Sequence, residues 1–156
     1  MRFIVDSNVG KLARWLRIAG FDALFIKDVD DSKLVRIALA EGRVLLTRDT
    51  EILKRRLATR GRMKVILIED DEVKAQLRQV MTTFGLASQI RPFTLCLECN
   101  ESLLPREMVD VKKLVPPHVF RTQTQYMQCP ACQRVYWRGT HWERMSRELE
   151  EIVGTM

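Results

Sequence analysis

Four short apolar runs, separated by segments with helical periodicity, occupy the first half of the chain. The runs cover residues 3–5, 23–26, 44–47 and 64–68. Between and after them, apolar residues recur at the spacing of one helix face, which predicts helices at about residues 8–19, 32–42, 50–61 and 71–84. This alternation predicts an α/β fold with a mainly parallel sheet and helices on both faces.

Each apolar run ends at or just before acidic residues. The acids that follow the first three runs are, in order, Asp6, then Asp28, Asp30 and Asp31, then Asp49. Ligands of open parallel sheets bind outside the carboxyl ends of the strands. Carboxylates gathered there raise each other's pKa unless a cation neutralises them, and Mg²⁺ or Mn²⁺ suits oxygen ligands. We therefore expect a divalent metal site at this edge.

A simpler explanation exists for each of these acids, because Asp is a preferred residue at the N-cap of a helix. For a single Asp the cap explanation is sufficient. Asp6 and Asp49 together, at the ends of two strands, favour a site that also takes a third carboxylate from residues 28–31. Such a site can activate water and stabilise charge on a scissile phosphodiester. The last acidic run, residues 69–71, is more typical of a turn and helix cap.

The net charge of +6 lies entirely in residues 1–93, whereas residues 94–156 are electrically balanced. A basic surface around an acidic pocket suits a polyanion, of which nucleic acid is the commonest. Candidate phosphate contacts are Lys11, Arg14 and Arg17 on the first predicted helix, and Arg48 beside Asp49. Lys11 and Arg48 fit ion pairs with the aspartates equally well, and Arg14 and Arg17 also fit a solvated helix face.

From residue 93 onward the chain changes character and contains all the cysteines. Two Cys-x₂-Cys motifs, Cys96/Cys99 and Cys129/Cys132, are separated by 29 residues. This pattern predicts a structural Cys₄ zinc ribbon with an insertion at about residues 105–118. Disulfides or a redox dithiol fit less well in a reducing compartment. We therefore divide the chain into residues 1–92, an α/β domain, and residues 93–156, a zinc ribbon with a final helix at about residues 141–153.

Two histidines and an aromatic segment complete the second module. With four cysteines as ligands, His118 and His141 are not needed for zinc. Residues 137–142 combine Trp, Arg and His side chains, which can stack on bases or bind phosphate. The alternative is that Trp137 and Trp142 pack the ribbon against the main domain. The packing explanation is favoured for the two tryptophans, while Arg138 and His141 stay open and Arg138 is kept as a candidate substrate contact.

Several of these motifs together resemble one known family. They are Asp6 followed by Gly-Lys-Leu-Ala-Arg-Trp-Leu-Arg at residues 10–17, the pair Asp30-Asp31, Leu-Leu-Thr-Arg-Asp at residues 45–49, and a Cys₄ ribbon ending in Val-Tyr-Trp-Arg-Gly at residues 135–139. This combination is similar to the Mut-seven C-terminal RNase domain family, a PIN-like group. The resemblance implies a PIN-like nuclease fold that acts on RNA through a divalent metal held by Asp6, Asp31 and Asp49. In the best-known PIN nucleases a helical Glu supplies one ligand; here Asp31, or its neighbours Asp28 and Asp30, would replace it.

The functional hypothesis is thus an Mg²⁺- or Mn²⁺-dependent ribonuclease acting on single-stranded RNA. The alternative is a non-catalytic RNA-binding module of PIN-like fold, acting in RNA processing or ribosome association. A receiver-like domain fits poorly because no Lys follows the last strand, and a dinucleotide-binding domain lacks its glycine motif. No apolar run approaches the roughly 20 residues of a membrane span, and residues 1–6 lack a signal-peptide layout, so we expect a cytoplasmic protein.

Overall fold

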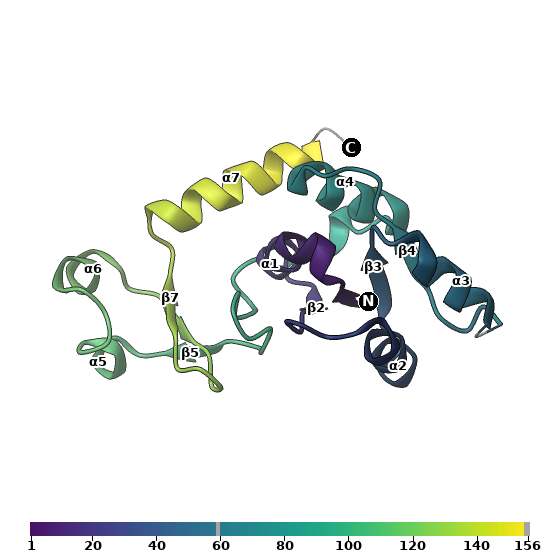
Figure 1. Cartoon of the computed structure of the whole chain (residues 1–156). Coiled ribbons are helices and arrows are strands. Elements are labelled where there is room, and N and C mark those ends of the chain that lie inside the picture. Colours follow the sequence, from purple (N-terminus) through teal and green to yellow (C-terminus); the bar gives the residue numbers. More distant parts are fainter. Residues whose placement is uncertain (59, 155–156) are drawn as a thin grey trace.

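The main domain is built on a parallel sheet (Figure 1). The computed structural model describes residues 1–58 and 60–154, without the side chains of residues 55–58. In spatial order β2-β1-β3-β4, the strands are β2 (Asp22–Leu24), β1 (Arg2–Val5), β3 (Val44–Thr47) and β4 (Val65–Leu67). All neighbouring pairs run parallel, which confirms the predicted α/β class.

Helices cover both faces of this sheet because side chains alternate along each strand. Phe3 and Val5 pack in one buried cluster with side chains of α1 (Gly10–Ile18) and α4 (Val73–Phe84). Ile4 points to the other face, where its cluster includes Leu34 of α2 (Asp31–Glu41) and Ile52 of α3 (Thr50–Ala58). Among the helices that the structure describes, none is long and apolar enough to cross a membrane.

The helix ends follow the capping residues in the sequence. Asp30 caps α2 by accepting a hydrogen bond from the Lys33 amide at 2.8 Å, and Gly42 ends that helix in the left-handed conformation. The first predicted helix differs, because it is a short 3₁₀ turn, η1 (Ser7–Val9), followed by α1. The Val9 amide donates to the carbonyl of Asp6 at 3.0 Å, which closes this tight turn.

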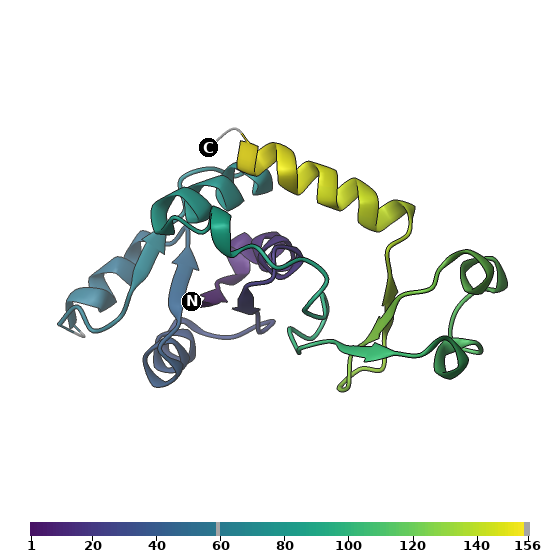
Figure 2. The ribbon, with the colours of Figure 1, turned by 180° about the vertical axis from the view of Figure 1, so that it is seen from behind.

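The second module contains a small antiparallel sheet and two short helices (Figure 2). Its strands are β5 (Leu104–Arg106), β6 (Tyr126–Gln128) and β7 (Val135–Trp137), in that spatial order. The insertion lies between β5 and β6 and carries α5 (Met108–Val111) and α6 (Pro117–Thr122). It thus extends beyond the predicted residue 118, because Val119 of α6 packs with Tyr126 and Val111 in a small cluster of its own.

The last helix, α7 (Thr140–Gly154), returns from the small sheet to the main domain and lies beside α4 (Figures 1 and 2). Its buried side chains join the same cluster as Leu77 and Val80 of α4; they are Trp142, Met145, Leu149 and Ile152. The rings of Trp142 and Phe93 meet edge to face, with centroids 5.0 Å apart. The helix α7 therefore packs across the predicted domain boundary after residue 92, and that boundary stays a prediction.

Gly20 fixes how the chain enters the second module, after the 3₁₀ turn η2 (Ala87–Gln89) that follows α4. The Arg91 amide donates to the Ala19 carbonyl at 2.8 Å, so the linker lies directly on the end of α1. Gly20 has φ +91°, and a Cβ atom built on it would lie 2.2 Å from the Arg91 carbonyl oxygen. Any larger residue would therefore both strain this backbone and displace the linker.

We expect Gly20→Ala to destabilise the protein more than Gly85→Ala. Gly85 also has positive φ, +60°, but no atom lies within 4 Å of a Cβ built there. The control should lose about 1 kcal/mol of unfolding free energy through backbone strain alone, and Gly20→Ala should lose at least about 1 kcal/mol more. Urea denaturation of the zinc-loaded variants measures the difference; equal losses would show that the linker contact is unimportant.

Candidate functional site

Asp6 lies at the carboxyl end of β1 and is only 5% exposed. Its amide donates to the Leu46 carbonyl of β3 at 2.9 Å, so the parallel pairing continues to this residue. Both carboxylate oxygens accept hydrogen bonds: Oδ2 from the Thr47 hydroxyl at 2.7 Å and Oδ1 from the Ser7 amide at 2.7 Å. The orientation of this carboxylate is therefore set by the protein.

Asp49 is joined to Asp6 through the same threonine. Its amide donates to Thr47 Oγ1 at 3.0 Å, and its own carboxylate accepts from the Glu51 amide at 2.9 Å, at the start of α3. Asn8 braces the loop between them, because its Oδ1 accepts from the Arg48 amide at 3.2 Å. The structure thus brings together the backbone positions of two of the three predicted carboxylates, just after the neighbouring strands β1 and β3.

The third position is at the start of α2, which follows β2 on the other side of β1. Asp31 is the first residue of α2 and is half-buried, Asp30 is the N-cap, and Asp28 has φ +59°. In the described part of the chain, only the cysteines form a set of three or more metal-ligating groups with donor atoms within 4.8 Å. The carboxylates of Asp6, Asp31 and Asp49 are not gathered so closely, and Asp31 as third ligand stays a prediction.

The acidic run at residues 69–71 lies in the turn before α4, as expected, but the helix cap is the next residue, Glu72. The Asp70 carboxylate accepts from the Glu72 amide at 2.8 Å, and the Glu72 carboxylate caps α4 at the Lys74 and Ala75 amides. Beside this turn lies a groove of about 590 Å³, whose lining includes Asn8, Lys11 and Glu72. An open groove therefore adjoins the loop that carries Asp6.

Thr47 is not among the predicted site residues, although it lies within the motif at residues 45–49. Its side chain is fully buried, and its hydroxyl links the Asp6 carboxylate to the Asp49 backbone amide. The sequence signal that could have identified Thr47 as a site residue is a threonine at the end of a buried strand, two residues before an aspartate.

Thr47→Val should therefore destabilise the protein. The substitution preserves shape but leaves Asp6 Oδ2 without its donor, which costs about 1–3 kcal/mol for a buried acceptor. Thr82→Val is a matched control on the exposed side of α4 and should change the unfolding free energy by less than about 0.5 kcal/mol. The two variants are compared by urea denaturation, and a Thr47→Val protein as stable as the control would contradict this account.

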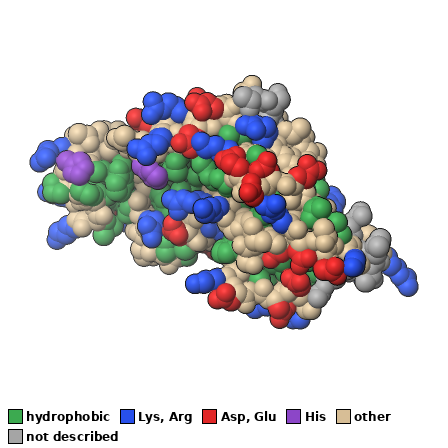
Figure 3. All heavy atoms as spheres, turned by 45° about the horizontal axis from the view of Figure 1, so that its top comes forward, with side chains coloured by type: hydrophobic (Ala, Val, Ile, Leu, Met, Phe, Trp, Pro, Cys, Tyr) green, Lys and Arg blue, Asp and Glu red, His purple; other side chains and the backbone are tan. Residues whose placement is uncertain are grey.

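The predicted basic contacts divide into exposed and buried groups. Lys11 and Arg48 are exposed near the carboxyl edge of the sheet. Arg14 is exposed but paired with Glu98 at 2.7 Å, and the Arg138 guanidinium lies 5.0 Å from the centroid of the Phe93 ring. On the face of the molecule that Figure 3 shows, Lys and Arg side chains border exposed apolar side chains toward the end that carries the small sheet.

Arg17 does not fit the predicted phosphate contact. It is only 7% exposed, and its guanidinium donates to the carbonyls of Ala23 at 2.9 Å and Leu97 at 2.8 Å. Burial lowers the pKa of this group, an effect partly offset by nearby acidic side chains and thiols. The periodicity of the helix predicts that Arg17 is surface-exposed, but the second module covers it. Its function in this structure is to hold the first cysteine turn against α1.

Asn100 makes a second connection between the modules, at the edge strand β2. Its Oδ1 accepts from the Ala23 amide at 2.9 Å, and its Nδ2 donates to Asp22 Oδ1 at 2.6 Å. Although burial alone would raise the pKa of Asp22, hydrogen bonds from Arg43 and Asn100 hold it below its usual value. The first cysteine turn therefore covers a strand edge that would otherwise expose unpaired backbone groups.

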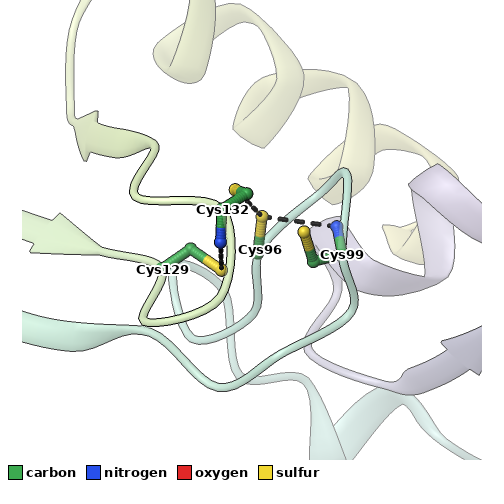
Figure 4. Close-up of side chains that lie close together, drawn as sticks. All are labelled: Cys96, Cys99, Cys129 and Cys132. Carbon is green, nitrogen blue, oxygen red and sulfur yellow. Dashed lines mark hydrogen bonds between the residues drawn. The ribbon is translucent and has the colours of Figure 1, made fainter.

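The four cysteines converge on one point from two turns (Figure 4). All are free thiols, and the Sγ atoms of Cys96 and Cys132, one from each turn, are 3.7 Å apart. This separation is far longer than the roughly 2.05 Å of a disulfide, and close to the about 3.8 Å expected for two sulfurs on one tetrahedral Zn²⁺. The cluster can therefore hold a metal ion, and the all-thiolate donor set fits zinc.

Hydrogen bonds tune the thiols of this cluster. The Cys99 amide donates to Cys96 Sγ and the Cys132 amide to Cys129 Sγ, each at 3.4 Å. The backbone amide of Arg134 is the main cause that lowers the pKa of Cys132 to about 7, whereas the hydrogen bond with Cys132 is the main cause that raises the pKa of Cys99 to about 12. Metal binding must therefore displace protons from the cluster.

We expect about one zinc ion per chain at neutral pH, bound less tightly as the pH falls, because each ligand must be a thiolate. Acidification from about pH 8 to about pH 5 with a competing chelator should release the ion, and a colorimetric zinc indicator follows the release. Cys96→Ser should lose zinc at higher pH, whereas Glu101→Gln, an exposed change nearby, should match the wild type. A wild-type protein without zinc affinity at neutral pH would contradict the assignment.

One comparison with known proteins gives a match. A family model described as Mut7-C RNAse domain matches residues 1–149, nearly the whole chain. The matched region includes the carboxyl edge of the parallel sheet and both cysteine turns. No curated protein and no solved structure matches the chain.

Proposed function

The chain belongs to the Mut7-C RNAse domain family, and we propose that it is a metal-dependent ribonuclease that hydrolyses phosphodiester bonds of single-stranded RNA. The observation that carries this proposal is the placement of Asp6 and Asp49 just after neighbouring strands. The Thr47 hydroxyl joins them, since it donates to the Asp6 carboxylate at 2.7 Å and accepts from the Asp49 amide at 3.0 Å. Carboxylates at the carboxyl edge of a parallel sheet lie where such folds bind their ligands.

Asp6, Asp49 and Asp31 would hold Mg²⁺ or Mn²⁺, because carboxylate oxygens suit hard divalent cations. When bound, such an ion activates water and stabilises the charge that develops on the phosphodiester. Thr47 is a positioning residue, since it fixes the Asp6 carboxylate from the strand next to it. Ser7 fixes the other oxygen of the same carboxylate.

RNA fits the charge distribution around this edge. Lys11 and Arg48 are exposed and flank the loops that follow β1 and β3. Cationic side chains at such positions neutralise phosphates and fix the register of a strand. The cysteine cluster has a structural role in this proposal, because four thiolates leave no open position on zinc for a substrate.

A non-catalytic RNA-binding module of PIN-like fold, acting in RNA processing or ribosome association, is the second candidate. One observation favours it: among the described residues, the carboxylates do not form a set as compact as the cysteine cluster. The same basic surface would then bind RNA without cutting it.

Asp6→Asn and Asp49→Asn should each reduce Mg²⁺- or Mn²⁺-dependent cleavage of a labelled single-stranded RNA by at least about 100-fold, because each removes a ligand charge. Asp70→Asn is the matched control, since this carboxylate closes the turn before α4, and should retain activity. The variants Asp28→Asn, Asp30→Asn and Asp31→Asn identify the third ligand as the one with the largest loss.

Cleavage that survives both Asp6→Asn and Asp49→Asn would refute the assignment of the site. RNA binding by the zinc-loaded wild type, without cleavage under either metal, would support the non-catalytic alternative. Each preparation is also assayed for zinc, so that a folding defect of the ribbon is not mistaken for loss of the catalytic metal.

A further inference from the structure

A pocket of about 260 Å³ lies where the two modules meet, away from the aspartates. Its lining comes from α1, the first cysteine turn, β7 with the turn before it, and the start of α7. One wall is aromatic, with Tyr136, Trp137 and Trp142, and its polar groups include Arg14, Arg134 and His141. Aromatic and cationic side chains from four segments therefore meet in one concave site.

The aromatic wall is held in place by the protein itself. The Tyr136 hydroxyl contacts Cys96 Sγ and accepts from the Leu97 amide, both at 3.1 Å. Trp142 packs against Phe93, and Trp137 lies so close to Gly139 that a Cβ there would be 3.0 Å from its Nε1. Because these rings are already held in place, stacking a ligand on them would cost little conformational entropy of the protein.

The charged side of the pocket is asymmetric. Arg14 and Glu98 form an ion pair at 2.7 Å, so their charges largely cancel. Arg134 is exposed on the same pocket and supplies a net positive charge. The N-terminus of the 15-residue helix α7 also faces this pocket through Thr140 and His141, and the helix dipole adds to the attraction for an anion.

We propose that this pocket binds one nucleotide of an RNA strand, with the base against the aromatic wall and its phosphate between Arg134 and the start of α7. The volume is below the roughly 300–1,000 Å³ of sites for drug-sized ligands, which suits one base rather than a longer segment. Bases stack on Tyr, Trp and His with little sequence preference. Glu98 lies on the same pocket and accepts hydrogen bonds, so it favours a base with an amino group.

The pocket is connected to the carboxylate edge by the exposed side of α1. Lys11 and Arg14 are three residues apart, so they lie on the same face of that helix, about 4.5 Å apart along its axis. Lys11 lines the groove beside Asn8, and Arg14 lines this pocket. A strand that follows α1 would reach both, and this route, unlike binding in the pocket, rests on the proposed ribonuclease function.

Binding is tested with the zinc-loaded full chain and a short fluorescent single-stranded oligoribonucleotide, without added Mg²⁺ or Mn²⁺. Arg134→Ala and His141→Ala should each weaken binding by roughly five- to ten-fold in fluorescence anisotropy, through loss of a phosphate or stacking contact. Arg121→Ala is the matched control, because Arg121 is exposed on α6 and is not part of the pocket, and should bind within about two-fold of wild type. A nucleoside 5′-monophosphate should compete with the oligonucleotide.

Wild-type affinity in both pocket variants would overturn the proposal, as would equal weakening by Arg121→Ala. Arg134 also interacts with Cys132, so zinc content is measured for each variant; His141→Ala, on α7, decides the outcome if Arg134→Ala loses zinc. Unchanged binding in these variants with cleavage lost in Asp6→Asn would refute the pocket and leave the ribonuclease standing. Weakened binding with no metal-dependent cleavage in the wild type would refute the ribonuclease and leave the pocket standing.

Discussion

The parallel pairing of β1 with β3 is the constraint on which the site depends. It aligns Val5 with Leu46, so the residues that follow the two strands emerge side by side. The Thr47 hydroxyl then donates to the Asp6 carboxylate and accepts from the Asp49 amide. A buried carboxylate is costly unless hydrogen bonds satisfy it, and here both oxygens of Asp6 are satisfied by the chain itself. The hydrogen bonds that orient the Asp6 carboxylate are therefore also part of what makes the strand ends stable.

The second module is attached to the main domain through both polar and apolar contacts. Arg17 and Asn100 connect α1 and β2 to the first cysteine turn, and both use backbone groups of the opposite module. The position of these backbone groups depends on how the turn is folded, and a metal held by the cysteines would fix that fold. Burial of α7 against α4 adds an apolar contact on the other side. Metal binding in the ribbon and order at the edge of the main sheet should thus be coupled.

The same attachment creates the pocket that we assign to a nucleotide. Neither module contains it alone, because Arg14 comes from α1 and Tyr136 from the ribbon. The chain would then have two separate RNA contacts, a carboxylate edge where bonds are cut and an aromatic pocket that holds the strand. This arrangement explains how a ribbon without an open metal position can still contribute to the action of a ribonuclease domain.

The sequence by itself determined the local elements and the chemistry that they carry. Apolar periodicity and caps such as Asp30 and Gly42 are local signals, and paired Cys-x₂-Cys motifs have few other uses. Only the tertiary structure decided that Arg17 is buried. By helical periodicity it shares a face with exposed basic residues, but a segment about 80 positions away in the sequence covers it. It also decided that Thr47 joins two aspartates and that α7 packs across the predicted domain boundary. These contacts link distant segments, and periodicity reports which face of an element is buried without identifying what covers it.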